Sequence, residues 1–276
     1  MHRDADREWQ LLAMTIPMQR PSEPCWEAPR SLVRDWSLPW PGKLRTGKLP
    51  LVHFAAFDPA LFARHDAATA QARGLGWNDS LSGSVPRRQG EFFYGRWAAR
   101  AALQEGGLPC VAVGSGPARE PLWPAQTIGS ITHVDGLAAA AAASSSSCRR
   151  IGLDLERLAV GDQQQALRGL VVDRGELRLL ESLSVDRLDL WVTIAFSAKE
   201  SFYKAAYPTV GRFFDFTAAQ VVSVNPGAGR LMLEVVEPLD EIFVAGSRWP
   251  VDFDVFRDGV VLTAVLEEAR LPARNP

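Results

Sequence analysis

Two carboxylates stand two residues apart in the segment IGLDLE. Asp154 and Glu156 alternate with apolar residues, as in a strand, so both acids point to one face, ~6–7 Å apart. One interpretation is a half-buried strand whose polar face meets water. The other is a site for a hard cation such as Mg²⁺, which would remove the repulsion between the acids and still accept waters and substrate phosphates. Gly152 would then leave room for a bulky ligand.

A glutamate and a lysine stand four residues apart in FSAKESFYKAAY. Glu200 and Lys204 share a face of the expected helix, and Ser197 lies one turn earlier. One interpretation is an ordinary surface ion pair, worth ~0.2–0.5 kcal/mol. Another is a capping box formed by Ser197 and Glu200, although the apolar pattern already begins upstream at Trp191. Taken alone, the local pattern favours the surface ion pair.

The densest basic group lies between residues 87 and 100, and two further candidates follow it. The group consists of Arg87, Arg88, Arg96 and Arg100, and the later candidates are Arg119 and His133. Solvated side chains explain any one of these, whereas together they could bind a phosphorylated ligand. The histidines and cysteines show no HxxxH, HExxH or CxxC spacing, which gives zinc chemistry and a disulfide framework no support. The chain also has no P-loop and no GxGxxG motif.

Composition limits the remaining classes of function. The chain has 276 residues, 47% hydrophobic and 22% charged, with a formal net charge of −2. This composition predicts a soluble globular protein of one large domain or two packed halves, and not a nucleic-acid binder, which would be strongly basic. No run approaches the ~20 apolar residues of a membrane span, and a charged start with Pro17 is unlike a signal peptide. We therefore expect a cytoplasmic protein with no membrane partner.

The elements that would position these residues are three helices and several strands. Helices are predicted at 59–74, 91–105 and 186–207. The helix at 91–105 would carry Arg96 and Arg100 on a basic edge. The first fifty residues, rich in proline, receive no assignment.

The predicted strands follow the helices. Leu137–Ala143 could be helix or strand, and we favour a strand that turns back through a hairpin tip at 144–150. Short alternating segments follow at 213–225, 229–237, 249–259 and 260–268. Helix followed by strands thus occurs twice, which predicts an α+β fold of two pseudo-duplicated halves, 1–150 and 151–276.

Four segments together resemble one family. GLDLE, followed about forty residues later by FSAKESFYK, resembles the paired signature of 4′-phosphopantetheinyl transferases. RRQGEFFYGRWAARAAL and REPLWPAQTIGSITHVDGLAAAA resemble upstream signatures of the enterobactin synthetase component D subgroup, although Gln126 stands where that subgroup usually has glycine. The resemblance spans Arg87 to Tyr207. It implies two similar α+β halves with the active site at their interface.

The resemblance also implies an activity and a set of site residues. The family moves the phosphopantetheine arm of coenzyme A to a serine of an apo acyl or peptidyl carrier protein, uses Mg²⁺ and releases adenosine 3′,5′-bisphosphate. The implied metal ligands are Asp154, Glu156 and Glu200. The implied catalytic residues are Glu200, as the base for the serine hydroxyl, and Lys204, near the pyrophosphate. The residues implied to hold coenzyme A are Lys204, Arg119, His133, Arg88 and Arg96.

Two other classes of function are compatible with the same residues. A non-catalytic carrier-binding module would keep the fold without turnover, and a metal-dependent phosphohydrolase would cleave coenzyme A without a carrier. The transferase interpretation predicts a monomer. Carriers of fatty-acid, polyketide, siderophore or other peptide synthesis all suit it.

Overall fold

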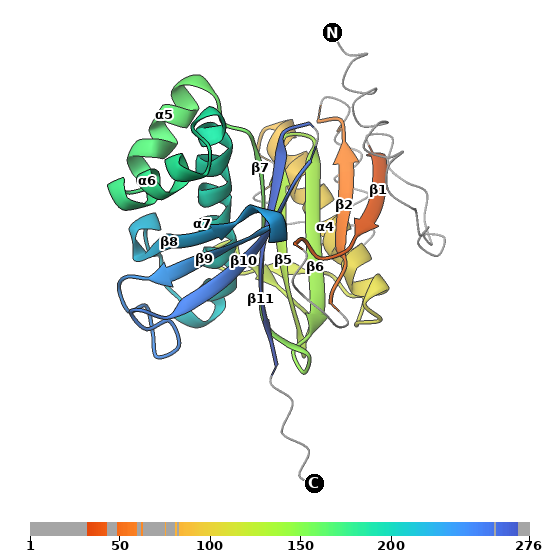
Figure 1. Ribbon diagram of the computed structural model, residues 1–276. Helices are drawn as coiled ribbons and strands as arrows, with labels where there is room; N and C mark the ends of the chain where they lie inside the picture. The colour runs from red at the N-terminus through yellow and green to blue at the C-terminus, as the bar shows by residue number, and fades with distance from the viewer. Residues whose placement is uncertain are drawn as a thin grey trace.

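The computed structural model describes residues 32–42, 49–59, 62, 75, 81, 83–256 and 258–269. The helix predicted at 59–74 and most of the unassigned first fifty residues lie outside these ranges. Figure 1 shows two parts side by side, each with a sheet and at least one helix against it. Within the described ranges, none of the helices combines the length and apolar character that a bilayer crossing requires.

The first half is a four-stranded antiparallel sheet covered by one long helix. Its strand order is β1-β2-β6-β5, and α4 packs on β6, β2 and β5 (Figure 1). A small hairpin, β3-β4, follows the helix. The elements are β1 (Leu32–Leu38), β2 (Val52–Phe57), α4 (Pro86–Glu105), β3 (Gly114–Ser115), β4 (Pro121–Leu122), β5 (Thr127–Val134) and β6 (Leu137–Ser144).

The second half is a five-stranded antiparallel sheet with three helices. Its order is β7-β11-β10-β9-β8, and α7 lies against β7 and β11. Short 3-10 turns at Val185–Arg187, Phe216–Ala218 and Pro226–Ala228 join some of the elements. The elements are β7 (Cys148–Arg157), α5 (Gly161–Leu170), α6 (Arg174–Leu183), α7 (Leu188–Val210), β8 (Ala219–Asn225), β9 (Arg230–Val235), β10 (Arg248–Val255) and β11 (Val260–Glu268).

The two halves repeat one topology. In the first, β2 is followed by α4 and then by β5 and β6, and β6 pairs with both β5 and β2. In the second, β7 is followed by α7 and later by β10 and β11, and β11 pairs with both β10 and β7. The predicted α+β fold of two pseudo-duplicated halves is therefore confirmed.

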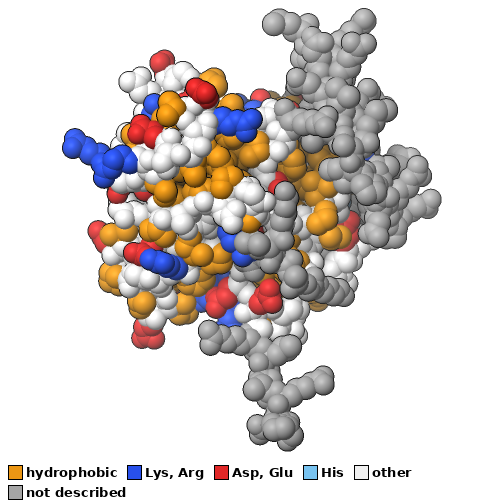
Figure 2. Space-filling model, viewed as in Figure 1, with side chains coloured by type: hydrophobic (Ala, Val, Ile, Leu, Met, Phe, Trp, Pro, Cys, Tyr) orange, Lys and Arg blue, Asp and Glu red, His pale blue; other side chains and the backbone are white. Residues whose placement is uncertain are grey.

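Packing in the core determines which face of β7 carries the acidic side chains. Ile151, Leu153 and Leu155 join a buried cluster that also contains Val52 and Phe54 of β2. Because side chains alternate along a strand, Gly152, Asp154 and Glu156 face the opposite way, toward α7. Figure 2 shows apolar side chains gathered over the second half on the face viewed, with charged side chains scattered among them.

Several sequence expectations can be compared with these elements. The helix predicted at 91–105 begins earlier, at Pro86, because proline suits the first helical turn. Strand rather than helix is confirmed for Leu137–Ala143, which is buried between β2 and β5. The helix predicted at 186–207 runs from 188 to 210, with Pro208 in its last turn. The last four strands are confirmed, but residues 213–218 precede β8 and do not belong to it.

The hairpin predicted around residues 144–150 is wrong. The serine turn there carries the chain from β6 in the first sheet to β7 in the second, and these two strands do not pair. The actual hairpin joins β5 and β6 at Asp135 and Gly136, where Gly136 takes a positive φ of 75° that glycine tolerates. Which strands pair depends on how apolar side chains from the whole chain are buried together. A local apolar run does not predict its partner strand.

Candidate active site

The carboxylate strand β7 lies closer to helix α7 than its sequence suggests. A Cβ at Gly152 would overlap the backbone carbonyl of Ser201 and lie 2.8 Å from the Ala205 nitrogen. The glycine therefore allows strand and helix backbones to touch. The expectation that Gly152 leaves room for a ligand is wrong, because α7 fills that space.

Asp154 is buried under α7 and bonded on both of its oxygens. It is 4% exposed. Its Oδ1 accepts hydrogen bonds from Lys204 Nζ at 2.6 Å and Thr132 Oγ1 at 3.3 Å, and its Oδ2 accepts one from Ser197 Oγ at 2.8 Å. The water-facing interpretation of this acid is therefore wrong.

These contacts also decide between the interpretations of the helix motif. Lys204 pairs with Asp154 of the neighbouring strand, so the Glu200–Lys204 spacing is not surface decoration. Ser197 lies inside α7, whose N-cap is Arg187, and so it does not cap a helix. The spacing instead places an acid and a base on the face of α7 that meets β7.

The remaining two acids are electrostatically coupled to Asp154. Burial, followed by the charges of Asp154 and Glu200, raises the pKa of Glu156 to about 8, although Lys204 opposes the shift. Burial, followed by the charge of Asp154, raises the pKa of Glu200, again against Lys204. The three predicted metal ligands are therefore close enough for their charges to act on one another, with Lys204 opposing the effect.

The donor set fits a divalent cation by its chemistry. Carboxylate oxygens are the preferred ligands of Mg²⁺. Burial raises the pKa values of Glu156 and Glu200 most, the repulsion between the acids adds to the effect, and a cation among them would relieve that repulsion. In the part of the chain that the structure describes, no group of three or more His, Cys, Asp or Glu side chains is arranged so that it could hold a metal ion, so the three acids fit a cation by their chemistry and not by their present arrangement. Lys204 is the positive group bound to Asp154.

Two predicted phosphate-binding residues of the first half meet beside this acid group. Arg88 Nη1 lies 3.3 Å from His133 Nε2. The Glu91 carboxylate lies 3.6 Å from Arg88 and 3.8 Å from His133. Burial lowers the pKa of His133, against the raising effect of Glu91, while Lys204 and Arg88 lower it further. The His133 side chain contacts Arg88 and Glu91 of α4, and the charge of Lys204 on α7 still acts on it.

The other two predicted phosphate-binding residues lie at the β3-β4 hairpin. Arg96 is 6% exposed, not on an open basic edge as expected, and its Nη2 donates to Gly114 O and Ser115 Oγ, both at 2.9 Å. Burial, with a smaller contribution from Arg88, lowers the pKa of Arg96 to about 10. Arg96 thereby anchors the β3-β4 hairpin, and Arg119 lies exposed in its turn with φ 68°.

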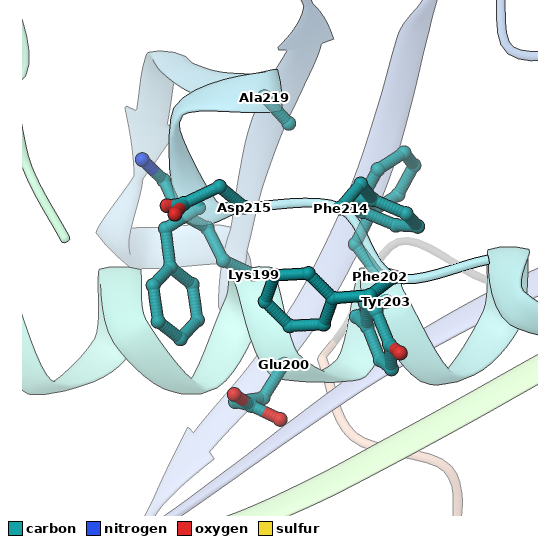
Figure 3. Close-up of a pocket in the computed structure, with 9 residues that line it drawn as sticks. Lys199, Glu200, Phe202, Tyr203, Phe214, Asp215 and Ala219 are labelled. Atoms are coloured by element: carbon teal, nitrogen blue, oxygen red, sulfur yellow. The ribbon is translucent and has the colours of Figure 1, made fainter. Parts of the chain in front are cut away.

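A pocket opens next to Glu200. Its volume is about 140 Å³. In Figure 3, Glu200 and Tyr203 project from α7, and the segment with Phe214 and Asp215 runs alongside the helix. Phe213, 75% exposed, contributes to the same pocket. The lining residues are Lys199, Glu200, Phe202, Tyr203, Phe213, Phe214, Asp215, Phe216 and Ala219.

The buried lysine of this pocket has a structural partner. Lys199 Nζ lies 2.8 Å from Glu176 and donates to Val171 O at 2.7 Å. Glu176 also accepts from the amides of Asp173 and Val221. This acid therefore joins α6, α7 and β8 behind the pocket.

Sequence reasoning missed Thr132, Ser197 as a partner of Asp154, and the α6 region. For Thr132, a usable signal was the alternation in GSITH, which places Ser130 and Thr132 on one face of a strand. For α6, the signal was Asp173 three residues before Glu176, the spacing of the capping box that the structure contains.

Comparisons with known proteins match both halves. Residues 78–143 match the 4′-phosphopantetheinyl transferase N-terminal domain, and residues 150–255 match the 4′-phosphopantetheinyl transferase superfamily. The chain is 33% identical to 4′-phosphopantetheinyl transferase Npt of Nocardia iowensis over 199 residues, which are 67% of this chain and 85% of the relative. It is 34% identical to 4′-phosphopantetheinyl transferase Svp of Streptomyces mobaraensis over 186 residues, 66% of this chain and 73% of the relative. It is 34% identical to enterobactin synthase component D of Salmonella typhi over 174 residues, which are 63% of this chain and 69% of the relative.

Proposed function

Because the chain belongs to the 4′-phosphopantetheinyl transferase superfamily, we propose that it transfers the phosphopantetheine arm of coenzyme A to a serine of an apo acyl or peptidyl carrier protein. Adenosine 3′,5′-bisphosphate is the product released. The observation that carries this proposal is the coupling of Asp154, Glu156, Glu200 and Lys204 at the meeting of β7 and α7. The division of the chain into halves at 1–150 and 151–276 belongs to the same proposal.

In the proposed reaction, the carrier serine oxygen attacks the phosphorus that bears the pantetheine arm. The bond from that phosphorus to the bridging oxygen of the pyrophosphate breaks, and the bisphosphate leaves with the electron pair. Glu200 takes the serine proton, a role favoured by its raised pKa, because a base is most effective when its pKa approaches the working pH. Lys204 offsets the charge that develops on the departing side.

Asp154, Glu156 and Glu200 would hold Mg²⁺. When bound, the ion would neutralise negative charge on the pyrophosphate oxygens. Lys204, which forms an ion pair with Asp154, would contact the same phosphates.

Coenzyme A would be held mainly by the first half. Arg88 and His133 lie 3.3 Å apart, and the Arg88 guanidinium and a His133 ring N–H would both donate hydrogen bonds to phosphate oxygens. Arg119 would reach the ligand from the hairpin that Arg96 anchors. The aromatic pocket beside Glu200 suits part of an arm of methylenes and amides.

The partner and cellular setting follow from the same chemistry. One chain supplies both sides of the site, which supports a monomer. Similarity to enterobactin synthase component D favours siderophore-assembling carriers, and fatty-acid, polyketide and other peptide carriers have the same reacting serine. We predict a cytoplasmic location, where coenzyme A is available.

The test is to incubate the protein with coenzyme A, MgCl₂ and an apo carrier protein and to measure the intact mass of the carrier. One phosphopantetheine per carrier is expected with the wild type and none with Asp154→Ala. Hydrolysis of coenzyme A without a carrier would instead identify a phosphohydrolase. Carrier binding without a change of mass would identify a non-catalytic module.

A further inference from the structure

The two sheets meet through side-chain hydroxyls. β5 at the edge of the first sheet runs beside β7 at the edge of the second. The backbone amide of Leu153 donates to Ser130 Oγ at 2.9 Å, and that of Leu155 donates to Thr132 Oγ1 at 3.0 Å. Ser130 and Thr132 are both 3% exposed. Each hydroxyl therefore satisfies a buried amide that would otherwise be costly to leave unpaired.

Thr132 makes two contacts that Ser130 lacks. Lys204 Nζ donates to Thr132 Oγ1 at 3.3 Å, and Thr132 Oγ1 donates to Asp154 Oδ1 at 3.3 Å. A hydroxyl has one proton to donate and two lone pairs. Because the Leu155 amide and the Lys204 ammonium use the lone pairs, the proton of Thr132 is directed to Asp154.

The direction of these bonds fixes the geometry of the acid and the lysine. Asp154 Oδ1 and Lys204 Nζ lie 2.6 Å apart, and Thr132 lies 3.3 Å from each. Threonine has a stiff χ1 torsion because it is branched at Cβ. Its hydroxyl is also held by the Leu155 amide of the opposite half. A rotated Asp154 carboxylate would lose the Thr132 bond, so one orientation is favoured.

We infer that Thr132 is a positioning residue for the transfer reaction. From the first half, it sets the orientation of Asp154 and Lys204 in the second half. It is too buried to bind coenzyme A or a carrier by its hydroxyl, so it acts through those two side chains. This inference rests on the proposed function.

Ser130 provides a matched control. It lies on the same strand and face, is equally buried and accepts the same kind of amide bond. Within the described residues, its hydroxyl has no contact with Asp154 or Lys204. A purely structural role of the β5–β7 bonds predicts equal effects of removing either hydroxyl, and a positioning role predicts unequal ones.

The experiment compares initial transfer rates of Thr132→Val, Thr132→Ser and Ser130→Ala with the wild type, at varied coenzyme A. We expect Thr132→Val to lower kcat by ~10–100-fold, the usual effect of removing a residue that orients an active-site ligand. KM for coenzyme A should change little, because Thr132 does not itself contact coenzyme A and its removal should affect the transition state more than substrate binding. Ser130→Ala should keep kcat near the wild-type value, and Thr132→Ser should restore most of it.

A second readout does not depend on activity. Hydrogen exchange measured by NMR should show faster exchange of the Leu155 amide in Thr132→Val and of the Leu153 amide in Ser130→Ala. Should Thr132→Val fail to fold, Thr132→Ala removes the hydroxyl without placing a methyl group against Lys204 and is measured in its place.

Three results would overturn the inference. They are an unchanged kcat in Thr132→Val, equal losses of kcat in Thr132→Val and Ser130→Ala, and failure of Thr132→Ser to restore kcat. A wild-type protein that transfers nothing would overturn the proposed function itself, whereas normal wild-type transfer with an active Thr132→Val would overturn only the positioning role.

Discussion

The first strands of the two halves, β2 and β7, occupy equivalent places and carry opposite kinds of side chain. All six residues of β2, VHFAAF, are buried, and its one polar residue, His53, is bonded to Ser37. β7 presents Asp154 and Glu156 to its helix. The topology is repeated, but of these two equivalent strands only β7 presents acids to its covering helix.

The carboxylates of the two halves differ in the same way. At the end of α4, Ser37 donates to Glu105. Although burial raises it, the pKa of Glu105 is lowered overall by hydrogen bonds from His53 and Ser37. The pKa values of Glu156 and Glu200 are raised, because burial and neighbouring acids outweigh Lys204. In the first half, hydrogen bonds stabilise the charged form of Glu105. In the second half, the charged forms of Glu156 and Glu200 are disfavoured and would be stabilised by a cation, and such raised pKa values are typical of functional sites.

The largest expected effect comes from exchanging one acid in each half. Asp154→Asn keeps the size of the side chain but removes its charge, so we expect the transfer rate to fall by at least ~10²-fold. Glu105→Gln should keep the wild-type rate, because Glu105 serves only the packing of the first half. Initial rates from the intact mass of the carrier measure both.

A drop of similar size in both variants would contradict this contrast. It would mean that acids of the first half also contribute to transfer. Far-UV circular dichroism of each variant controls for folding.

The second contrast concerns how closely each helix approaches its sheet. Gly152→Ala would force the backbones of β7 and α7 apart, so we expect a loss of ~1–3 kcal/mol in the free energy of unfolding. Gly90→Ala in α4 meets the ring edge of Phe57 at 3.3 Å, and this side chain can adjust. Helix propensity favours alanine there by up to ~1 kcal/mol. Urea unfolding measures the free energy of unfolding of both variants. An equal loss of that free energy in the two would contradict the inference that β7 and α7 approach more closely than α4 and its sheet.

The third contrast concerns pH. Because the pKa of Glu156 is raised from 4.5 to about 8, the folded protein binds a proton there that the unfolded chain releases. The contribution to stability therefore falls as the pH rises between these two values. Thermal unfolding in buffer with a chelator should show this decline in the wild type and a weaker one in Glu156→Gln. Superimposable pH profiles would show that Glu156 does not titrate as inferred.

The smallest expected effect lies in the first half. Arg96→Lys keeps the charge but loses the planar guanidinium, whose Nη2 donates to both Gly114 and Ser115, so the β3-β4 hairpin should loosen. We expect KM for coenzyme A to rise by about 3-fold with kcat unchanged, because the loss corresponds to no more than one weak hydrogen bond. An altered kcat with an unchanged KM would place Arg96 in the reaction itself and not in support of the hairpin.

Local periodicity was enough to predict much of this site. Alternation placed Asp154 and Glu156 on one face of a strand, and the four-residue spacing placed Glu200 and Lys204 on one face of a helix. The two halves followed from the order of elements, because a helix followed by strands is itself a local pattern.

The features that could not be predicted all depend on contacts between distant segments. The role of Gly152 is set by α7, some fifty residues later, and the burial of Arg96 is set by the hairpin after its helix. The apolar runs on either side of the serine turn predict a hairpin, because nothing local to them shows that they enter different sheets. The contacts of Thr132 depend on β5 lying beside β7, which no local pattern predicts.

The proposed transfer is tested most directly by the release of adenosine 3′,5′-bisphosphate from coenzyme A and Mg²⁺, measured with apo carrier, with a carrier whose reacting serine is alanine, and with no carrier. Release that requires the carrier serine, in equal amount to the modified carrier, is the predicted result. Release that continues without that serine would contradict it.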